Sequence, residues 1–106
     1  MDPGWQAAAP VSALDAKYPL LVTIGETEIA LCRVGDEVYA VENFCTHACA
    51  RLSDGMMRDH ELLCPLHGGS FDVRTGAPVE LPCDEPVRTF PTRIDQDNVF
   101  VKVGEG

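Results

Sequence analysis

The sequence lacks any hydrophobic run long enough to cross a membrane. Its apolar stretches are broken within a few residues, whereas a transmembrane helix needs about 20 mostly apolar residues in a row. The first twenty residues also lack a basic segment followed by an apolar core, which is the pattern of a secretory signal peptide. We therefore expect no membrane contact and a cytoplasmic protein.

Basic side chains are also scarce. Eight Lys and Arg residues stand against 17 Asp and Glu residues, which gives a net charge of -9 at pH 7. Such a charge repels the phosphates of nucleic acids, so a nucleic-acid-binding function is not expected. Protein partners with basic surfaces are one expectation, and a purely solubilising role of the charge is the other.

Segments rich in β-branched and aromatic residues recur along the chain, with turn signals between them. We expect strands at Leu20–Ile24, Thr27–Val34 and Glu37–Glu42, because Gly25-Glu26 and Gly35-Asp36 suit tight hairpin turns. Further strands are expected at residues 61–64, 70–74, 87–90, 91–94 and 99–103, the last two forming a hairpin around residues 95–98. The sequence therefore predicts a mostly antiparallel all-β fold.

Beyond these strands, the sequence predicts little regular structure and a single domain. A single helical turn is expected near residues 11–17, and no repeat or linker divides the sequence. With 106 residues, the chain is long enough for one domain with a core, but too short to add a substrate-binding catalytic domain.

Five cysteines are present, and two of them stand beside histidines. Cys45-Thr46-His47 is followed after 16 residues by Cys64-Pro65-Leu66-His67. The odd number of cysteines argues against a disulfide framework and favours a reducing compartment. Two thiolates and two imidazoles at this spacing suit either one Zn²⁺ ion or an iron–sulfur cluster.

The glycines after the second pair favour the cluster. Gly68-Gly69 follows His67 directly and lets the backbone approach bridging sulfides, which need N–H donors, with no Cβ in the way. A zinc ion has no such need, although ligand count alone leaves zinc as an alternative.

The segments CTHACARLSDG and CPLHGGSFDVRTG resemble the two cluster-binding loops of bacterial Rieske ferredoxins. The most similar subgroup is the electron carriers of multicomponent aromatic-ring dioxygenases, such as those for carbazole and biphenyl. The resemblance extends to RVGDEVYAVENFCTH and PVRTFPTRIDQDNVFVKV, and so covers most of the chain from about residue 19. It implies the Rieske fold, an antiparallel β-sandwich forming a single domain (1–106) with a two-loop cluster-binding subdomain (43–82).

The same resemblance implies one Rieske-type 2Fe-2S cluster. Cys45 and Cys64 would bind the inner iron, and His47 and His67 would bind an outer iron near the surface. The protein would then be no enzyme itself but a monomeric ferredoxin, which carries single electrons from an NAD(P)H-dependent flavoprotein reductase to a terminal Rieske oxygenase. The alternatives are a Rieske subunit of another oxidoreductase, such as a nitrite-reductase-like enzyme, and a zinc-stapled binding module.

Four positions depart from the pattern of respiratory Rieske proteins. Those proteins join the two loops by a disulfide between cysteines at the positions of Ala50 and Leu66, so no such disulfide is expected here. They also place a serine and a tyrosine near the cluster, at the positions of Gly69 and Phe71. With fewer hydroxyl donors, we expect a potential toward the lower end of the Rieske range of roughly -150 to +300 mV.

The other three cysteines receive no ligand role. Cys32 falls in an apolar strand and is expected to be a small core residue. Cys49 is expected to serve packing. Cys83 has no nearby positive charge that would lower its pKa, so a structural or incidental role is expected.

Overall fold

The computed structural model describes residues 4–46, 50–66 and 68–103. Its elements, in chain order, are β1 (Trp5–Pro10), η1 (Val11–Ala13), β2 (Leu20–Ile24), β3 (Thr27–Val34), β4 (Glu37–Glu42), η2 (Leu52–Asp54), β5 (Met56–Arg58), β6 (Glu61–Leu63), β7 (Ser70–Asp72), β8 (Pro78–Glu80), β9 (Thr89–Phe90), β10 (Thr92–Asp95) and β11 (Asn98–Lys102). Within these ranges, no helix is long and apolar enough to span a membrane.

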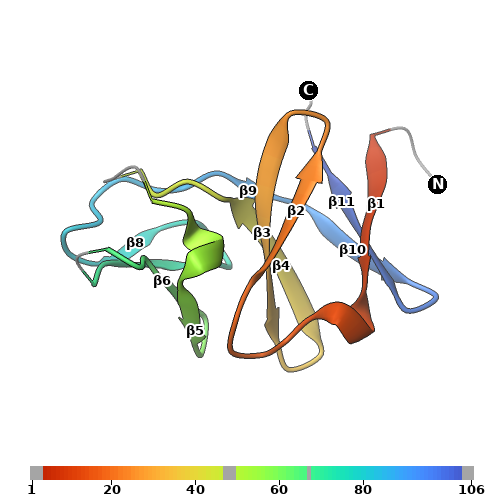
Figure 1. Cartoon of the computed structure of the whole chain (residues 1–106), viewed down its shortest axis with the longest axis horizontal. Helices are drawn as coiled ribbons and strands as arrows, with labels where there is room; N and C mark the ends of the chain where they lie inside the picture. The colour runs from red at the N-terminus through yellow and green to blue at the C-terminus, as the bar shows by residue number, and fades with distance from the viewer. Residues whose placement is uncertain (1–3, 47–49, 67, 104–106) are drawn as a thin grey trace.

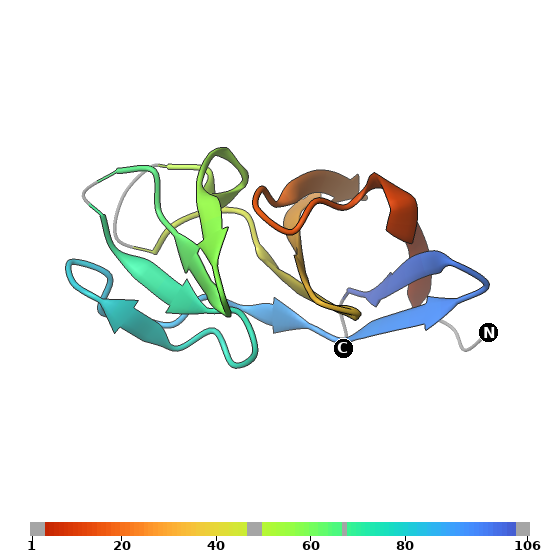
Figure 2. The ribbon, with the colours of Figure 1, turned by 90° about the horizontal axis from the view of Figure 1, so that it is seen from below.

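The strands form three antiparallel sheets (Figure 1). The strand orders are β1-β11-β10, β2-β3-β4-β9 and β5-β6-β7-β8. The first two sheets lie together at one end of the molecule, and the third lies at the other end, as the second view also shows (Figure 2). The predicted all-β antiparallel fold is therefore confirmed.

Two hydrophobic cores lie on opposite faces of the second sheet. The sandwich core, between the first two sheets, consists of Leu14, Ile29, Leu31, Val38, Ala40, Phe90, Val99 and Val101. The loop-side core, toward the third sheet, consists of Ala30, Cys32, Val41, Cys45, Ala50, Leu52, Met57, Leu62, Cys64, Phe71, Val73, Cys83 and Val87. Successive side chains from Ile29 to Cys32 in β3 enter the two cores alternately, which explains why these four residues are all apolar.

The predicted hairpins of the second sheet agree with the structure. Ile24 pairs with Thr27 and Val34 pairs with Glu37, so each turn has two residues. Gly25 and Gly35 take φ values of 62° and 61° in these turns, a region that glycine adopts without strain.

The last hairpin has the predicted register, with Ile94 paired with Val99, but its turn is shorter than predicted. Asp95 pairs with Asn98, so the turn consists of Gln96 and Asp97 alone, with φ values of 51° and 67°. Four consecutive polar residues suggested a longer loop, but two of them extend the strands.

Three strands were not predicted, and the bounds of the five strands predicted after residue 60 differ from the observed ones by one or two residues at an end. β1 is rich in alanine, which has low strand propensity, and it forms because it pairs with β11 at the other end of the chain. β5 and β8 have three residues each, too few for a periodic signal. The helical turn expected near residues 11–17 is the shorter 3-10 helix η1, which ends where Leu14 takes an extended conformation.

Asn43 joins the end of β4 to the segment that follows the first cysteine loop. It is fully buried, and its Nδ2 donates to Glu28 Oε1 at 3.1 Å. Its Oδ1 accepts a hydrogen bond from the backbone N–H of Ser53 at 2.7 Å, and its carbonyl accepts one from Leu52 at the same distance. One side chain therefore fixes β3 and η2 relative to each other.

Replacing Asn43 by alanine should remove the two side-chain hydrogen bonds, to Glu28 Oε1 and from the N–H of Ser53, and keep the backbone one. We expect Asn43→Ala to lower the free energy of unfolding by about 1–3 kcal/mol, as measured by urea denaturation. Asn98→Ala is the matched control, because Asn98 is exposed and only its Nδ2 bonds, to Gln96 O; its effect should stay within about 0.5 kcal/mol. Equal losses in the two variants would contradict the joining role of Asn43.

Candidate metal centre

The two loops that carry the predicted ligands are closed in the same way. In the first, Phe44 and Arg51 form an antiparallel bridge, and the N–H of Cys45 donates to Ala50 O at 3.0 Å. In the second, between β6 and β7, the N–H of Cys64 donates to Gly69 O at 2.8 Å. The N–H of each cysteine thus donates a hydrogen bond to the carbonyl of the residue five positions later. This bond closes the base of a short loop whose sequence contains a histidine.

The two cysteines bring their thiols together in the loop-side core. Cys45 is 6% exposed and Cys64 is 4% exposed. Burial raises the pKa of Cys64, a hydrogen bond from the backbone N–H of Leu66 opposes this rise, and the neighbouring Cys45 adds to it. Backbone N–H donors to cysteine sulfur are among the contacts that tune iron–sulfur sites, so these residues fit such a site.

Only half of the predicted ligand set can be compared with the structure. His47 and His67 lie outside the described residues, as does Cys49. Within the described ranges, no group of three or more His, Cys, Asp or Glu side chains is arranged to hold a metal ion. The assignment of Cys45, His47, Cys64 and His67 as a complete set therefore stays a prediction.

A third buried thiol lies at the site, and no sequence pattern indicated it. Cys83 follows β8, is 3% exposed, and has its Sγ 3.8 Å from Cys45 Sγ. Burial first, and the neighbouring Cys45 second, raise the pKa of Cys83 to about 12. The thiol is therefore not activated as a nucleophile, and its burial in the loop-side core agrees with the structural role that was one of the two expectations.

Cys32, by contrast, is the small core residue that was expected. It is fully buried in β3, and its Sγ lies 3.8 Å from Ala30 O in the same strand. Burial raises its pKa to about 12.

The two glycines of the second loop serve different purposes. A Cβ added to Gly69 would lie 2.4 Å from Cys83 Sγ and 3.0 Å from Cys83 N, so Gly69 makes room for the segment that carries Cys83. A Cβ on Gly68 would meet nothing within 4 Å, but the φ of +75° there favours glycine. The close approach at Gly69 therefore involves protein atoms of the Cys83 segment.

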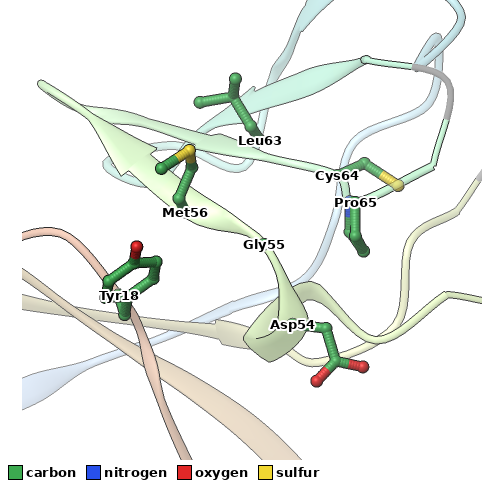
Figure 3. A pocket seen from close by; sticks show the side chains of 7 residues that line it. All are labelled: Tyr18, Asp54, Gly55, Met56, Leu63, Cys64 and Pro65. Atoms are coloured by element: carbon green, nitrogen blue, oxygen red, sulfur yellow. The ribbon is translucent and has the colours of Figure 1, made fainter.

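A pocket flanks the second loop on the side of β5 and β6 (Figure 3). It is lined by Tyr18, Asp54, Gly55, Met56, Leu63, Cys64 and Pro65. The side chain of Cys64 extends away from Met56 and Leu63 in this view. The pocket thus lies beside the start of the second loop, at Cys64 and Pro65.

Apolar side chains are exposed around the loops. Phe44 is 47% exposed, Leu66 is 45% exposed and Leu81 is 79% exposed. A groove between the two loops is lined by Phe44, Ala50, Arg51, Asp54, Pro65 and Leu66. Such an apolar surface with charged neighbours suits contact with another protein.

Comparison with known proteins agrees with this site. Residues 4–91 match the family model described as the Rieske 2Fe-2S domain. The anthranilate 1,2-dioxygenase ferredoxin subunit of Burkholderia cepacia is 41% identical over 100 residues, which cover 94% of this chain and 93% of that subunit.

Solved structures give the same result. The ferredoxin of carbazole 1,9a-dioxygenase from Nocardioides aromaticivorans IC177 superposes with a TM-score of 0.89 at 39% identity, over 92% of this chain and 96% of that one. A chain from the complex of reduced oxygenase and oxidized ferredoxin in carbazole 1,9a-dioxygenase gives a TM-score of 0.87 at 34% identity, over 95% and 94% of the two chains.

The approach of Gly69 to Cys83 predicts a specific energetic coupling. Gly69→Ala should lower the free energy of unfolding by about 1–3 kcal/mol, because its Cβ displaces buried neighbours. Adding Cys83→Ala should recover part of this loss, since it removes the sulfur from the 2.4 Å contact. Denaturant unfolding of both single variants and the double variant measures the coupling. Simple additivity of the two losses would contradict the contact.

Proposed function

The chain belongs to the Rieske 2Fe-2S domain family, and we propose that it carries single electrons from an NAD(P)H-dependent flavoprotein reductase to the terminal oxygenase of an aromatic-ring dioxygenase system. The cofactor is one Rieske-type 2Fe-2S cluster, which accepts and releases one electron when bound. The protein is an electron carrier and not the catalytic component of such a system.

One observation carries the proposal. The chain and the ferredoxin subunit of anthranilate 1,2-dioxygenase cover each other over 94% and 93% of their lengths. The same holds for the carbazole 1,9a-dioxygenase ferredoxin, at 92% and 96%. The similarity is thus to whole carrier proteins, and not only to the Rieske part of a larger enzyme.

The proposed ligands divide between thiolate and imidazole. Cys45 and Cys64 would hold the inner iron from the loop-side core, where both thiols are buried. His47 and His67 would hold the outer iron. This division follows the Rieske pattern, in which two cysteines bind one iron and two histidines bind the other.

The surface around the loops supports docking to an oxygenase. Phe44, Leu66 and Leu81 expose apolar area there, and the net charge of -9 favours partners with basic surfaces. In the carbazole 1,9a-dioxygenase complex, a ferredoxin of this fold is paired with its oxygenase. A carrier that docks briefly to successive partners needs such a patch and no large permanent interface.

The remaining inferences concern the location, the oligomeric state and the domain organisation of the protein. We infer that it is a cytoplasmic monomer. Residues 43–82 are its cluster-binding subdomain within a single domain, 1–106. The third sheet, from β5 to β8, lies inside these subdomain limits.

Electron paramagnetic resonance tests the ligand assignment. The reduced protein should give a rhombic signal, and His47→Cys or His67→Cys should change its g-values because sulfur replaces nitrogen on iron. His60→Asn is the control, since His60 has no cysteine at ligand spacing, and its signal should match that of the native protein. A colourless protein with one zinc per chain would refute the cluster, and unchanged g-values in both cysteine variants would refute the histidine ligands.

Reconstitution tests the carrier function. Product formation by a terminal aromatic-ring oxygenase, supplied with NADH and a flavoprotein reductase, should depend on the native protein and should be lost with Cys64→Ala, which removes a proposed ligand. Cys32→Ala, a buried thiol in β3, should retain activity. If the protein is reduced by the reductase but supports no oxygenase, the proposed partner is wrong.

A further inference from the structure

Cys83 is held beside the proposed iron ligand Cys45 by contacts on three sides. Its own N–H donates to Glu80 O at 3.1 Å, and Gly69 leaves the space that its sulfur fills. Two residues further on, Glu85 O accepts a hydrogen bond from Thr46 Oγ1 at 2.8 Å, which ties this segment to the first loop. The position of the Cys83 thiol is therefore determined by the fold.

The direction of the sulfur–sulfur contact follows from ligation. Cys45 Sγ and Cys83 Sγ are 3.8 Å apart, and either thiol could donate when both are protonated. Cysteine binds metal as a thiolate, so Cys45 has no proton to give once it binds iron. The only S–H that this pair retains then belongs to Cys83, and the thiolate of Cys45 is the acceptor.

We propose that Cys83 donates an S–H hydrogen bond to the sulfur of Cys45 and thereby raises the reduction potential of the bound cluster. The inference rests on the proposed ligand role of Cys45. Reduction adds negative charge to the cluster and its ligating sulfurs, so a donor to one of these sulfurs stabilises the reduced state more than the oxidised state. Cys83 is a positioning and tuning residue, and it does not itself bind iron.

Two variants that differ only in a hydroxyl test the donor. In protein-film voltammetry, Cys83→Ala should lower the potential by an amount that corresponds to about a three- to tenfold smaller equilibrium constant for reduction, where tenfold is about 59 mV. Cys83→Ser keeps a donor, so its potential should lie above that of Cys83→Ala. Cys32→Ala is the matched control, because its thiol is equally buried but lies next to Ala30 O in its own strand, and its potential should equal the native value.

Infrared spectroscopy of the native holoprotein gives a second readout that requires no stable variant. The S–H stretching band of Cys83, identified as the band missing in Cys83→Ser, should move to lower frequency on reduction because its acceptor becomes more negative. The band of Cys32 should stay in place. If Cys83→Ser does not hold a cluster, the native spectrum still decides: an S–H band that responds to reduction and exchanges with deuterium supports the donor, and the absence of any response refutes it.

Two voltammetric outcomes would also overturn the inference. An unchanged potential in Cys83→Ala, or equal shifts in Cys83→Ala and Cys83→Ser, would show that the sulfur only fills space. These failures differ from failure of the proposed function, because a native protein without a Rieske electron paramagnetic resonance signal would refute the function itself.

Discussion

The burial of β3 on both faces is the constraint on which the rest of the structure depends. Ile29 and Leu31 fill the sandwich core, while Ala30 and Cys32 fill the loop-side core. A slip of one residue in this strand would exchange large and small side chains between the cores, so its register is strongly fixed. The register in turn fixes where β4 ends at Glu42, and therefore where the first cysteine loop begins.

The site combines buried thiols with exposed apolar side chains. The thiols of Cys45, Cys64 and Cys83 are buried in the loop-side core, while Phe44 and Leu66 expose much of their surface nearby. Burial and hydrogen bonding of the ligating sulfurs are the means by which a protein sets the potential of an iron–sulfur cluster. Under the proposed carrier function, the buried thiols would set the potential, and the exposed apolar side chains would contact the partner.

Local sequence signals were sufficient for features whose partners are neighbours in the chain. The strands β2, β3 and β4 agree with the predicted ranges because two glycine turns delimit them, and the pattern of Cys45 and Cys64 identified the family. β1 was missed because its stability comes from β11, where Trp5 pairs with Lys102. Cys83 was missed for the same reason, since 38 residues separate it from Cys45.

That separation has a consequence for the entropy of chain closure. The hydrogen bonds that close the two cysteine loops join residues five positions apart, as from Cys45 to Ala50, and such short closures cost little chain entropy. The contact between Cys45 and Cys83 closes a much longer stretch, so its closure costs more chain entropy. The hydrogen bonds that close the two cysteine loops therefore do not depend on the Cys83 segment, whereas the contact that places a third thiol beside Cys45 requires the chain to return from β8.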